Sequence, residues 1–183
     1  FIEKPIASTV SQAKEIIEQA EKNGVTLMVG HIERFNPAVS KLKKIVEEGV
    51  LGKILFMTTR RVGPFNPRIK DTGIIVDYAT HDIDVVQHIM EKEPVDIYSK
   101  VGSVRHNKED HAFIVLDLGD AAASLEVNWF TPHKVRTLVA TGAKGIAYLD
   151  YIDQSLEILK PERPTSPLFF KTKGNSKNSF FFN

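Results

Sequence analysis

With 183 residues, 42% of them hydrophobic, the chain can bury the core of a globular domain. Its 24 Lys and Arg nearly balance its 23 Asp and Glu, which argues against nucleic acid or an anionic membrane as a partner. The chain has no cysteine, which excludes disulfides, thiolate zinc sites and cysteine nucleophiles. No apolar run approaches the roughly 20 residues that a membrane span needs, so we expect a soluble, cytoplasmic protein.

The first 30 residues have the pattern of a strand, a helix and a second strand. Pro5 ends the apolar opening of FIEKP, because proline lacks the N–H that a continuing strand needs. Thr9 and Gln12 can form a capping box at the start of a helix, and Gly24 suits its end. The run VTLMVG is typical of a strand in a parallel sheet. Because one βαβ unit has no sheet of its own to pack into, we expect its partner strands to lie upstream.

A second helix and a series of strands follow. Asn36 is a typical N-cap, Pro37 suits the first helical position, and Gly49 suits the end of that helix. From residue 53 to 160 the sequence changes to β-rich runs separated by short turns such as LGDA and TGAKG, which predicts a large, mostly antiparallel sheet. The expected strands are KILFMTTRRV, VDIYSKVGSV, HAFIVLDL, ASLEVNWF, KVRTLVAT, GIAYLDY and QSLEIL. Residues 161–183 lack periodicity and are expected to form an irregular tail.

The segment GIIVDYATHDIDVVQH carries four titratable side chains at spacings of four, three and four: Asp77, His81, Asp84 and His88. On a helix these side chains fall within roughly 60° of one another. The opposite, apolar face would consist of Ala79, Ile83, Val86 and Met90. Three interpretations stay open: the polar face of a surface helix, a metal site, or an acid/base pair directed into a cleft.

Other candidate motifs are short. Neither G-x-G-x-x-G nor the P-loop pattern occurs, and no G-x-S-x-G marks a nucleophilic serine. Glu3 and Lys4 stand at the carboxyl end of a predicted parallel strand, the edge where open α/β sheets bind ligands, although EKP also suits a solvated turn. Arg34 is a candidate for substrate contact. A basic cluster, in a segment that also suits a solvated loop, consists of Arg60, Arg61, Arg68 and Lys70.

Three motifs in a fixed order carry a family resemblance. EKP after a strand, GHIERFNPA after the next strand, and G-x-x-x-D-x-x-x-H-x-x-D on a helix resemble the Gfo/Idh/MocA family of nicotinamide-dependent oxidoreductases. GHIERFNPA, RRVGPFNPRIKDTGIIVDYATHDIDV, EDHAFIVLDL and NWFTPHKVRTLVATG are similar to the branch that contains UDP-N-acetylglucosamine 3-dehydrogenases. The resemblance implies an α/β plus α+β fold. Residues 1–31 would be the last βαβ unit of a Rossmann domain, and residues 32–160 an open, mostly antiparallel sheet domain with helices on one face.

The same resemblance implies roles for individual residues. His81 would act as the base, because it can change charge near neutral pH, while Lys4 would stabilise the developing alkoxide. Asp77 would orient His81 or join its proton relay. Glu3, Lys4 and Pro5 would form the floor under the nicotinamide of NAD or NADP. Asp84 and His88 are expected to make supporting contacts or to face solvent. Apart from the resemblance, one or two residues of the basic cluster, with Arg60 and Arg68 among the candidates, are expected to grip the diphosphate of a nucleotide sugar, because the planar fork of arginine suits phosphate oxygens. Arg34 is a second candidate for substrate contact.

The implied reaction is oxidation of a hydroxyl of a sugar or nucleotide sugar, with UDP-N-acetylglucosamine at C3 as one candidate. Because the glycine fingerprint is absent, we expect this polypeptide alone to bind dinucleotide poorly and to be inactive. A homo-oligomer through the open sheet face is also expected. Two other classes stay open: a non-catalytic sugar-nucleotide-binding or assembly module, and a metal-dependent hydrolase or isomerase with ligands among His31, Asp77, His81, Asp84 and His88.

Overall fold

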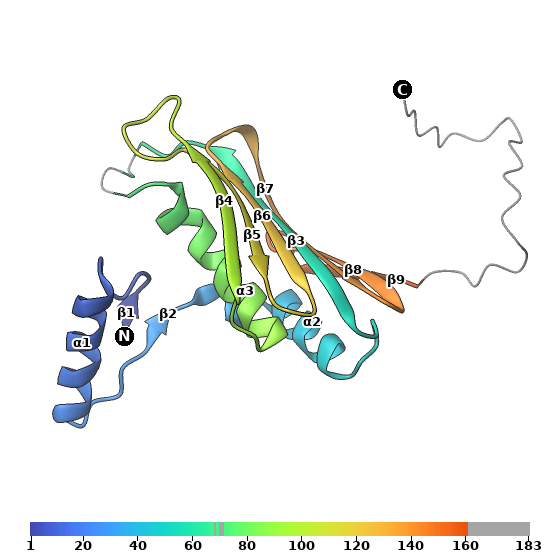
Figure 1. Ribbon diagram of the computed structural model, residues 1–183, viewed down its shortest axis with the longest axis horizontal. Helices are drawn as coiled ribbons and strands as arrows, with labels where there is room; N and C mark the ends of the chain where they lie inside the picture. Colours follow the sequence, from blue (N-terminus) through green and yellow to red (C-terminus); the bar gives the residue numbers. More distant parts are fainter. Residues whose placement is uncertain (68, 70–71, 161–183) are drawn as a thin grey trace, which may run out of the picture.

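Two sheets organise the protein (Figure 1). The computed structural model describes residues 1–67, 69 and 72–160. A two-stranded sheet lies near the N-terminus, and a seven-stranded sheet with helices on one face follows it. This arrangement confirms the predicted combination of an α/β unit with a mostly antiparallel sheet. The division of the chain at residue 31 stays a prediction, and the predicted tail at 161–183 lies outside the described residues.

The βαβ unit consists of β1 (Ile2–Glu3), α1 (Val10–Lys22) and β2 (Val29–Gly30). Its strands pair in parallel, with Ile2 opposite Val29. Helix α1 begins after Thr9, whose hydroxyl accepts a hydrogen bond from the backbone N–H of Gln12 (3.2 Å). This is one half of the predicted capping box; the reciprocal bond from the Gln12 side chain is not found among the described residues. The strand expected over VTLMVG is reduced to its last two residues. Because the partner strand is equally short, Val25 has nothing to pack against and stays exposed.

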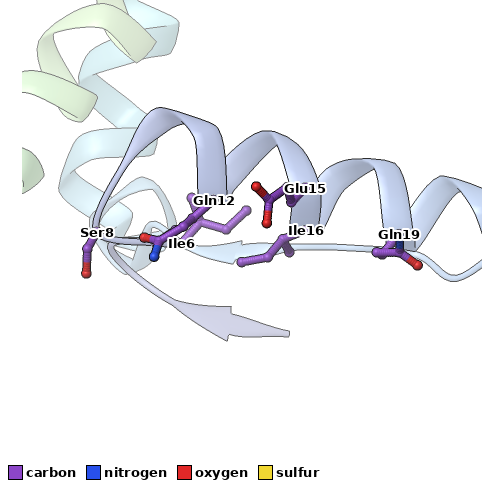
Figure 2. A pocket seen from close by; sticks show the side chains of 7 residues that line it. Ile6, Ser8, Gln12, Glu15, Ile16 and Gln19 are labelled. Atoms are coloured by element: carbon purple, nitrogen blue, oxygen red, sulfur yellow. The ribbon is translucent and has the colours of Figure 1, made fainter.

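A groove runs along α1 beside the loop that follows β1 (Figure 2). Its lining consists of Ile6, Ala7, Ser8, Gln12, Glu15, Ile16 and Gln19. Among the described residues that line it, Glu15 is the only titratable side chain, and the others are apolar or neutral. The groove therefore offers surface for packing and no pair of groups for acid/base chemistry.

The large sheet has the strand order β4-β5-β6-β3-β7-β8-β9. Its strands are β3 (Ile54–Pro64), β4 (Asp96–Gly102), β5 (His111–Asp117), β6 (Ala122–Asn128), β7 (Phe130–Gly142), β8 (Gly145–Asp150) and β9 (Ser155–Leu159). Only β3 and β6 pair in parallel; all other neighbours are antiparallel. The predicted TGAKG hairpin is confirmed, because Gly142 pairs with Gly145 across the turn between β7 and β8.

Helices cover one face of this sheet and leave the other open (Figure 1). They are η1, a 3-10 helix (Ile32–Phe35), α2 (Pro37–Glu47), η2 (Ile75–Ala79) and α3 (Thr80–Met90). Strand residues alternate accordingly: Leu125 and Leu138 are fully buried under the helices, whereas Phe113 and Tyr148 are exposed on the far face. Asn36 caps α2 by accepting from the N–H of Ala38 (3.0 Å). One-sided burial is the pattern that the alternating sequence predicted.

The GIIVDYATH segment differs from the prediction of one regular helix. Its first part, η2, is a π-helix, and α3 begins only at Thr80. The wider turn changes the rotation between Asp77 and the residues of α3. Ala79 and Val86 of the predicted apolar face are nevertheless fully buried. In α3 the buried positions include Val85, Ile89 and the charged Asp82 and Asp84, whereas Ile83 is only half-buried.

Candidate active site

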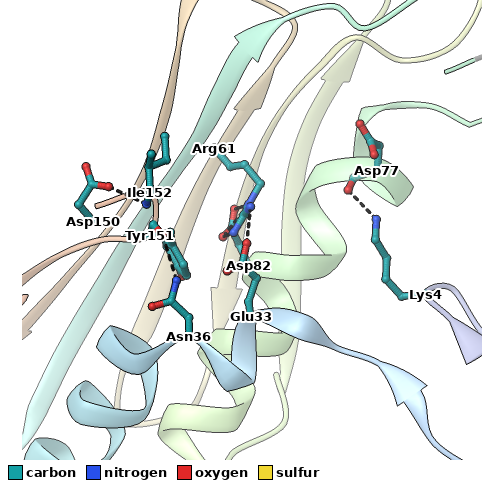
Figure 3. Close-up of polar contacts among 9 residues, drawn as sticks. All are labelled: Lys4, Glu33, Asn36, Arg61, Asp77, Asp82, Asp150, Tyr151 and Ile152. Carbon is teal, nitrogen blue, oxygen red and sulfur yellow. Dashed lines mark hydrogen bonds and ion pairs between the residues drawn. The ribbon is translucent and has the colours of Figure 1, made fainter. Parts of the chain in front are cut away.

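Lys4 joins the small sheet to the large one (Figure 3). Its Nζ donates hydrogen bonds to the carbonyl oxygens of Val76 (3.0 Å) and Asp77 (2.7 Å) in η2. The π-helical turn makes room for this contact, because the N–H of Thr80 bonds to the carbonyl of Ile75 and not to that of Val76. Burial lowers the pKa of Lys4, although the nearby charge of Asp77 raises it. The lysine therefore fixes the end of β1 beside the residues of the opening motif.

The carboxyl group of Asp77 is half-buried beside this lysine. Its backbone oxygen, and not its carboxylate, accepts from Lys4 (Figure 3). The carboxylate atom Oδ2 is buried with no hydrogen-bond partner in the part of the chain that the structure describes. Burial raises the pKa of Asp77, while the charges of Lys4 and Arg136 and the indole of Trp129 act in the opposite direction. Oδ2 of Asp77 and the indole N–H of Trp129 are thus two buried polar groups without a hydrogen-bond partner in the described part of the chain.

The imidazole of His81 is neutral at physiological pH. Burial lowers its pKa to about 3, and the positive charges of Lys4, Arg61 and Arg136 act in the same direction. Within the described ranges its ring makes no hydrogen bond, to Asp77 or to any other group. The ring is therefore held in its neutral form, in which one ring nitrogen can act as an acceptor.

Arg136 completes this group, and sequence reasoning missed it. It lies on β7 directly opposite Arg61 of β3, and its guanidinium carbon stands 6.0 Å from the ring centroid of Tyr78 in η2. Its charge lowers the pKa of both Asp77 and His81. Residues that lie opposite each other on antiparallel strands point to the same face of the sheet. Arg61 and Arg136 are 75 residues apart, however, and no local pattern in a single sequence shows that they pair.

A buried ion network lies behind the candidate site (Figure 3). Arg61 donates to both carboxylate oxygens of Asp82 on α3 (3.1 Å each) and to Oε1 of Glu33 on η1 (2.8 Å). Both Arg61 and Asp82 are about 1% exposed. The structure thus places Arg61 inside the fold and not in a solvated basic loop. The two-residue alternation of Met57, Thr59 and Arg61 is the sequence signal that could have shown this.

The other predicted substrate residues lie apart from this group. Arg34 pairs with Asp84 on α3, where its Nε lies 2.9 Å from Oδ2 and where Nδ1 of His31 also approaches, 3.1 Å from Oδ1. Asp84 is therefore a support, as expected. Arg60 pairs with Glu126 (2.9 Å) on the open face of the sheet, away from the helices. Arg68 lies outside the described residues. The structure brings together Lys4, Asp77 and His81, and it does not bring Arg34 or Arg60 to them.

Neither a metal cluster nor a membrane helix is found in what the structure describes. Among residues 1–67, 69 and 72–160, no three His, Asp or Glu side chains gather closely enough to hold a metal ion. Asp84, one of the possible ligands, is already taken by Arg34 and His31. No helix in the same ranges is long and apolar enough to cross a membrane.

Family comparisons agree with this architecture. The GFO/IDH/MocA C-terminal domain matches residues 39–148, which is more than half of the chain. The chain belongs to the GFO/IDH/MocA family. The oxidoreductase family described as an NAD-binding Rossmann fold matches residues 1–31. The family resemblance expected from EKP, GHIERFNPA and the Asp77–His81 spacing is thereby confirmed.

Relatives within the GFO/IDH/MocA family carry several activities. The chain is 26% identical over 168 residues to UDP-N-acetylglucosamine 3-dehydrogenase of Acidithiobacillus ferrooxidans, covering 91% of this chain and 52% of that protein. Its solved structure matches with a TM-score of 0.78 at 25% identity, over 87% of this chain and 52% of that one. A 2,7-anhydro-N-acetylneuraminate hydratase of Escherichia coli is 30% identical over 169 residues (82% and 44%). Myo-inositol 2-dehydrogenase of Thermotoga maritima is 28% identical over 180 residues (89% and 52%). The chain spans about half the length of these relatives.

The N-terminal unit fits one end of the NAD molecule that the family description names. Glu3 and Pro5 are exposed at the carboxyl edge of β1, with Lys4 beside them. At the end of β2, a Cβ on Gly30 would lie 3.0 Å from the Glu3 carboxylate, so glycine leaves room for that side chain over the strand end. This edge suits a nicotinamide ring, whereas no glycine fingerprint for a diphosphate occurs in the sequence.

The low pKa of His81 predicts acid-sensitive folding. An unfolded chain protonates this residue near pH 6.5, but the folded chain does so only near pH 3. Between these values the unfolded state binds more protons, so the free energy of unfolding falls as the pH falls, by up to about 1.4 kcal/mol per pH unit. Urea unfolding at several pH values should therefore show a shallower acid loss for His81→Gln than for the wild type. The same change at the exposed His133 should leave the slope unaltered; equal slopes for all three proteins would contradict the assigned pKa.

Proposed function

We propose that this chain supplies the substrate-facing part of an NAD(P)-dependent dehydrogenase that oxidises a hydroxyl group of a sugar, polyol or nucleotide sugar. The observation that carries the proposal is the meeting of Lys4 with the Asp77–His81 segment, across more than 70 residues of sequence. Membership of the GFO/IDH/MocA family and the match of residues 1–31 to an NAD-binding fold support it.

In this proposal His81 takes the hydroxyl proton of the substrate. Its neutral ring is in the accepting form, and the alkoxide that develops beside it raises its pKa during the reaction, because an opposite charge favours imidazolium. The ammonium group of Lys4 stabilises the same alkoxide. Asp77, with its raised pKa and its free buried oxygen, receives the proton from His81. Glu3, Lys4 and Pro5 would hold the nicotinamide, which would supply the hydride acceptor when bound.

The substrate class follows from the named relatives. One acts on UDP-N-acetylglucosamine and another on myo-inositol, both of which carry secondary hydroxyl groups. We therefore take UDP-N-acetylglucosamine, oxidised at C3, as the first candidate, and cyclic polyols as the next. The cofactor is NAD or NADP.

A cofactor-reduction assay tests the proposal. The protein expressed from its full reading frame is incubated with NAD or NADP and a panel of nucleotide sugars, sugars and inositols, and reduced nicotinamide is followed by absorbance. We expect reduction with at least one hydroxyl substrate and a product that has lost two hydrogens by mass. Binding of a sugar nucleotide without any reduction would favour a non-catalytic module. A product that has gained water would instead favour the reaction of the hydratase relative.

The open face of the large sheet is proposed to be covered by a second copy of the chain. Tyr98, Phe113 and Tyr148 are all exposed on strands there, beside the Arg60–Glu126 ion pair. Apolar side chains on an unfilled sheet face are typical of an isologous interface. Light scattering that gives the mass of a monomer at micromolar concentration would contradict this assembly.

A further inference from the structure

A cavity opens next to the candidate catalytic group, between η1 and the ends of β7 and β8. Its volume is about 450 Å³, which lies within the usual range for small-molecule sites. Both apolar and polar side chains line it, among them Ile32, Phe35, Asn36, Lys134, Arg136 and Tyr151. Figure 3 shows Asn36 and Tyr151 meeting at this place, where the side-chain amide of Asn36 donates to the carbonyl of Tyr151 (3.0 Å).

Arg136 differs from three of the four other arginines in the described part of the chain. The guanidinium groups of Arg34, Arg60 and Arg61 are each held by a carboxylate. Arg136 is half-buried, yet within the described ranges its side chain has neither a hydrogen bond nor an ion pair, and its guanidinium group lies over the ring of Tyr78. A guanidinium group has five N–H donors, and leaving them unused in a partly dry site is unfavourable.

The local charge also favours an anion. Lys134, two residues before Arg136 on the same face of β7, is exposed and makes no ion pair in the described part of the chain. Glu33 lines the cavity, but its carboxylate is bound by Arg61. The side chains of Arg61, Asp82 and Glu33 together carry a net charge of −1. Arg136 and Lys134 add two positive charges. The cavity therefore has a net positive lining.

We propose that this cavity is an oxyanion subsite, in which Arg136, assisted by Lys134, binds a phosphate or carboxylate group of the substrate. A planar guanidinium binds two oxygens of such a group at once. Ile32 and Phe35, which are 56% and 68% exposed, offer apolar surface to the sugar ring or base attached to it. Because Arg136 also acts on Asp77 and His81, a ligand held by it extends toward the catalytic group. The claim that the bound ligand extends toward the catalytic group rests on the proposed function.

The single tryptophan of the chain provides a direct readout of binding. The ring of Trp129 stands edge-on to Tyr78, with centroids 6.4 Å apart, and Arg136 lies over that same tyrosine. The intact protein is titrated with inorganic pyrophosphate, with glucuronate and with neutral glucose, and tryptophan fluorescence is recorded. We expect a saturable change with an oxyanion at concentrations at least tenfold below those at which glucose acts. Pyrophosphate and glucuronate distinguish a phosphate from a carboxylate preference.

Variants locate the subsite. Arg136→Ala should weaken oxyanion binding at least tenfold, Arg136→Lys should restore part of it, and Lys134→Ala should weaken it several-fold. Arg105→Ala is the control. Like Arg136, Arg105 lies over an aromatic ring (5.1 Å from the centroid of Phe130) and makes no ion pair within the described ranges, but it is exposed and does not line the cavity. Circular dichroism shows whether each variant is folded; if Arg136→Ala is not, Arg136→Lys and Lys134→Ala carry the test.

The outcomes separate this inference from the proposed function. Oxyanion binding that depends on Arg136, in a protein that never reduces nicotinamide, supports the subsite and contradicts the dehydrogenase. Turnover that is unaffected in Arg136→Ala and Lys134→Ala, or equal binding of pyrophosphate, glucuronate and glucose, overturns the subsite and leaves the dehydrogenase standing.

Discussion

Replacing His81 by asparagine is expected to lower kcat/KM of the intact enzyme by about 10² to 10⁴-fold, the range typical of a lost general base. KM should change much less, because the substrate would still meet Lys4 and the other cations of the site. His88→Asn is the matched control, since His88 lies two turns further along α3 beside Lys43, whose Nζ binds its carbonyl (2.9 Å). Steady-state rates of nicotinamide reduction provide the measurement. If both variants kept wild-type rates, His81 would not be the base.

The pH profile gives the same prediction an independent check. A base works only when deprotonated, so activity is lost as the pH falls through its pKa. Burial and the neighbouring cations place the pKa of His81 at about 3, so this residue should produce no acid limb in kcat/KM near pH 6.5. Asp77→Asn removes Asp77 as a source of a fall in activity at acid pH. If kcat/KM of this variant still fell below about pH 6.5, an imidazole with an ordinary pKa would be acting as the base, and the low pKa assigned to His81 would be wrong.

Removing Arg61 should produce the largest loss of stability in the molecule. Arg61→Ala leaves the buried Asp82 and the nearly buried Glu33 without a counter-charge, and breaking such a pair costs about 3–5 kcal/mol. Lys44→Ala, which removes one partner of the exposed Lys44–Glu48 pair (3.7 Å), should cost less than about 1 kcal/mol. Urea unfolding followed by circular dichroism compares the two variants.

A double variant identifies the origin of that loss. In Arg61→Met combined with Asp82→Leu, both buried charges are replaced by apolar side chains, and part of the stability should return. Glu33, whose side chain is 12% exposed, can then reach water. A loss below about 1 kcal/mol for Arg61→Ala, or a double variant less stable than the single one, would show that the network does not hold η1, α3 and β3 together.

Local sequence patterns predicted most of the fold. β-rich runs mark the strands of the large sheet, with period-two alternation clearest in β5 and β6, and the caps at Thr9 and Asn36 mark two helix starts. These signals depend on neighbouring residues alone. Strand order was not predictable in this way. The parallel pairing of β3 with β6 follows from long-range packing, which no turn sequence encodes.

The candidate site was predicted in part for the same reason. Lys4, Asp77 and His81 were found through motifs, and the structure brings them together. The π-helical turn, by contrast, is stabilised by the contact of its carbonyls with Lys4, more than 70 residues away in sequence. Arg136 faces the site only because β7 pairs with β3 in one register. The basic cluster was misread because Arg60 and Arg61, adjacent in sequence, point to opposite faces of β3.

The most direct test of the account is a crystal structure of the intact protein with oxidised nicotinamide cofactor and a bound polyol or nucleotide sugar. We predict that the nicotinamide lies against Glu3, Lys4 and Pro5, and that one substrate hydroxyl lies within about 2.6–3.2 Å of both the His81 imidazole and Nζ of Lys4. A substrate bound on the open sheet face, or one whose hydroxyl groups all lie beyond hydrogen-bond reach of His81, would contradict it.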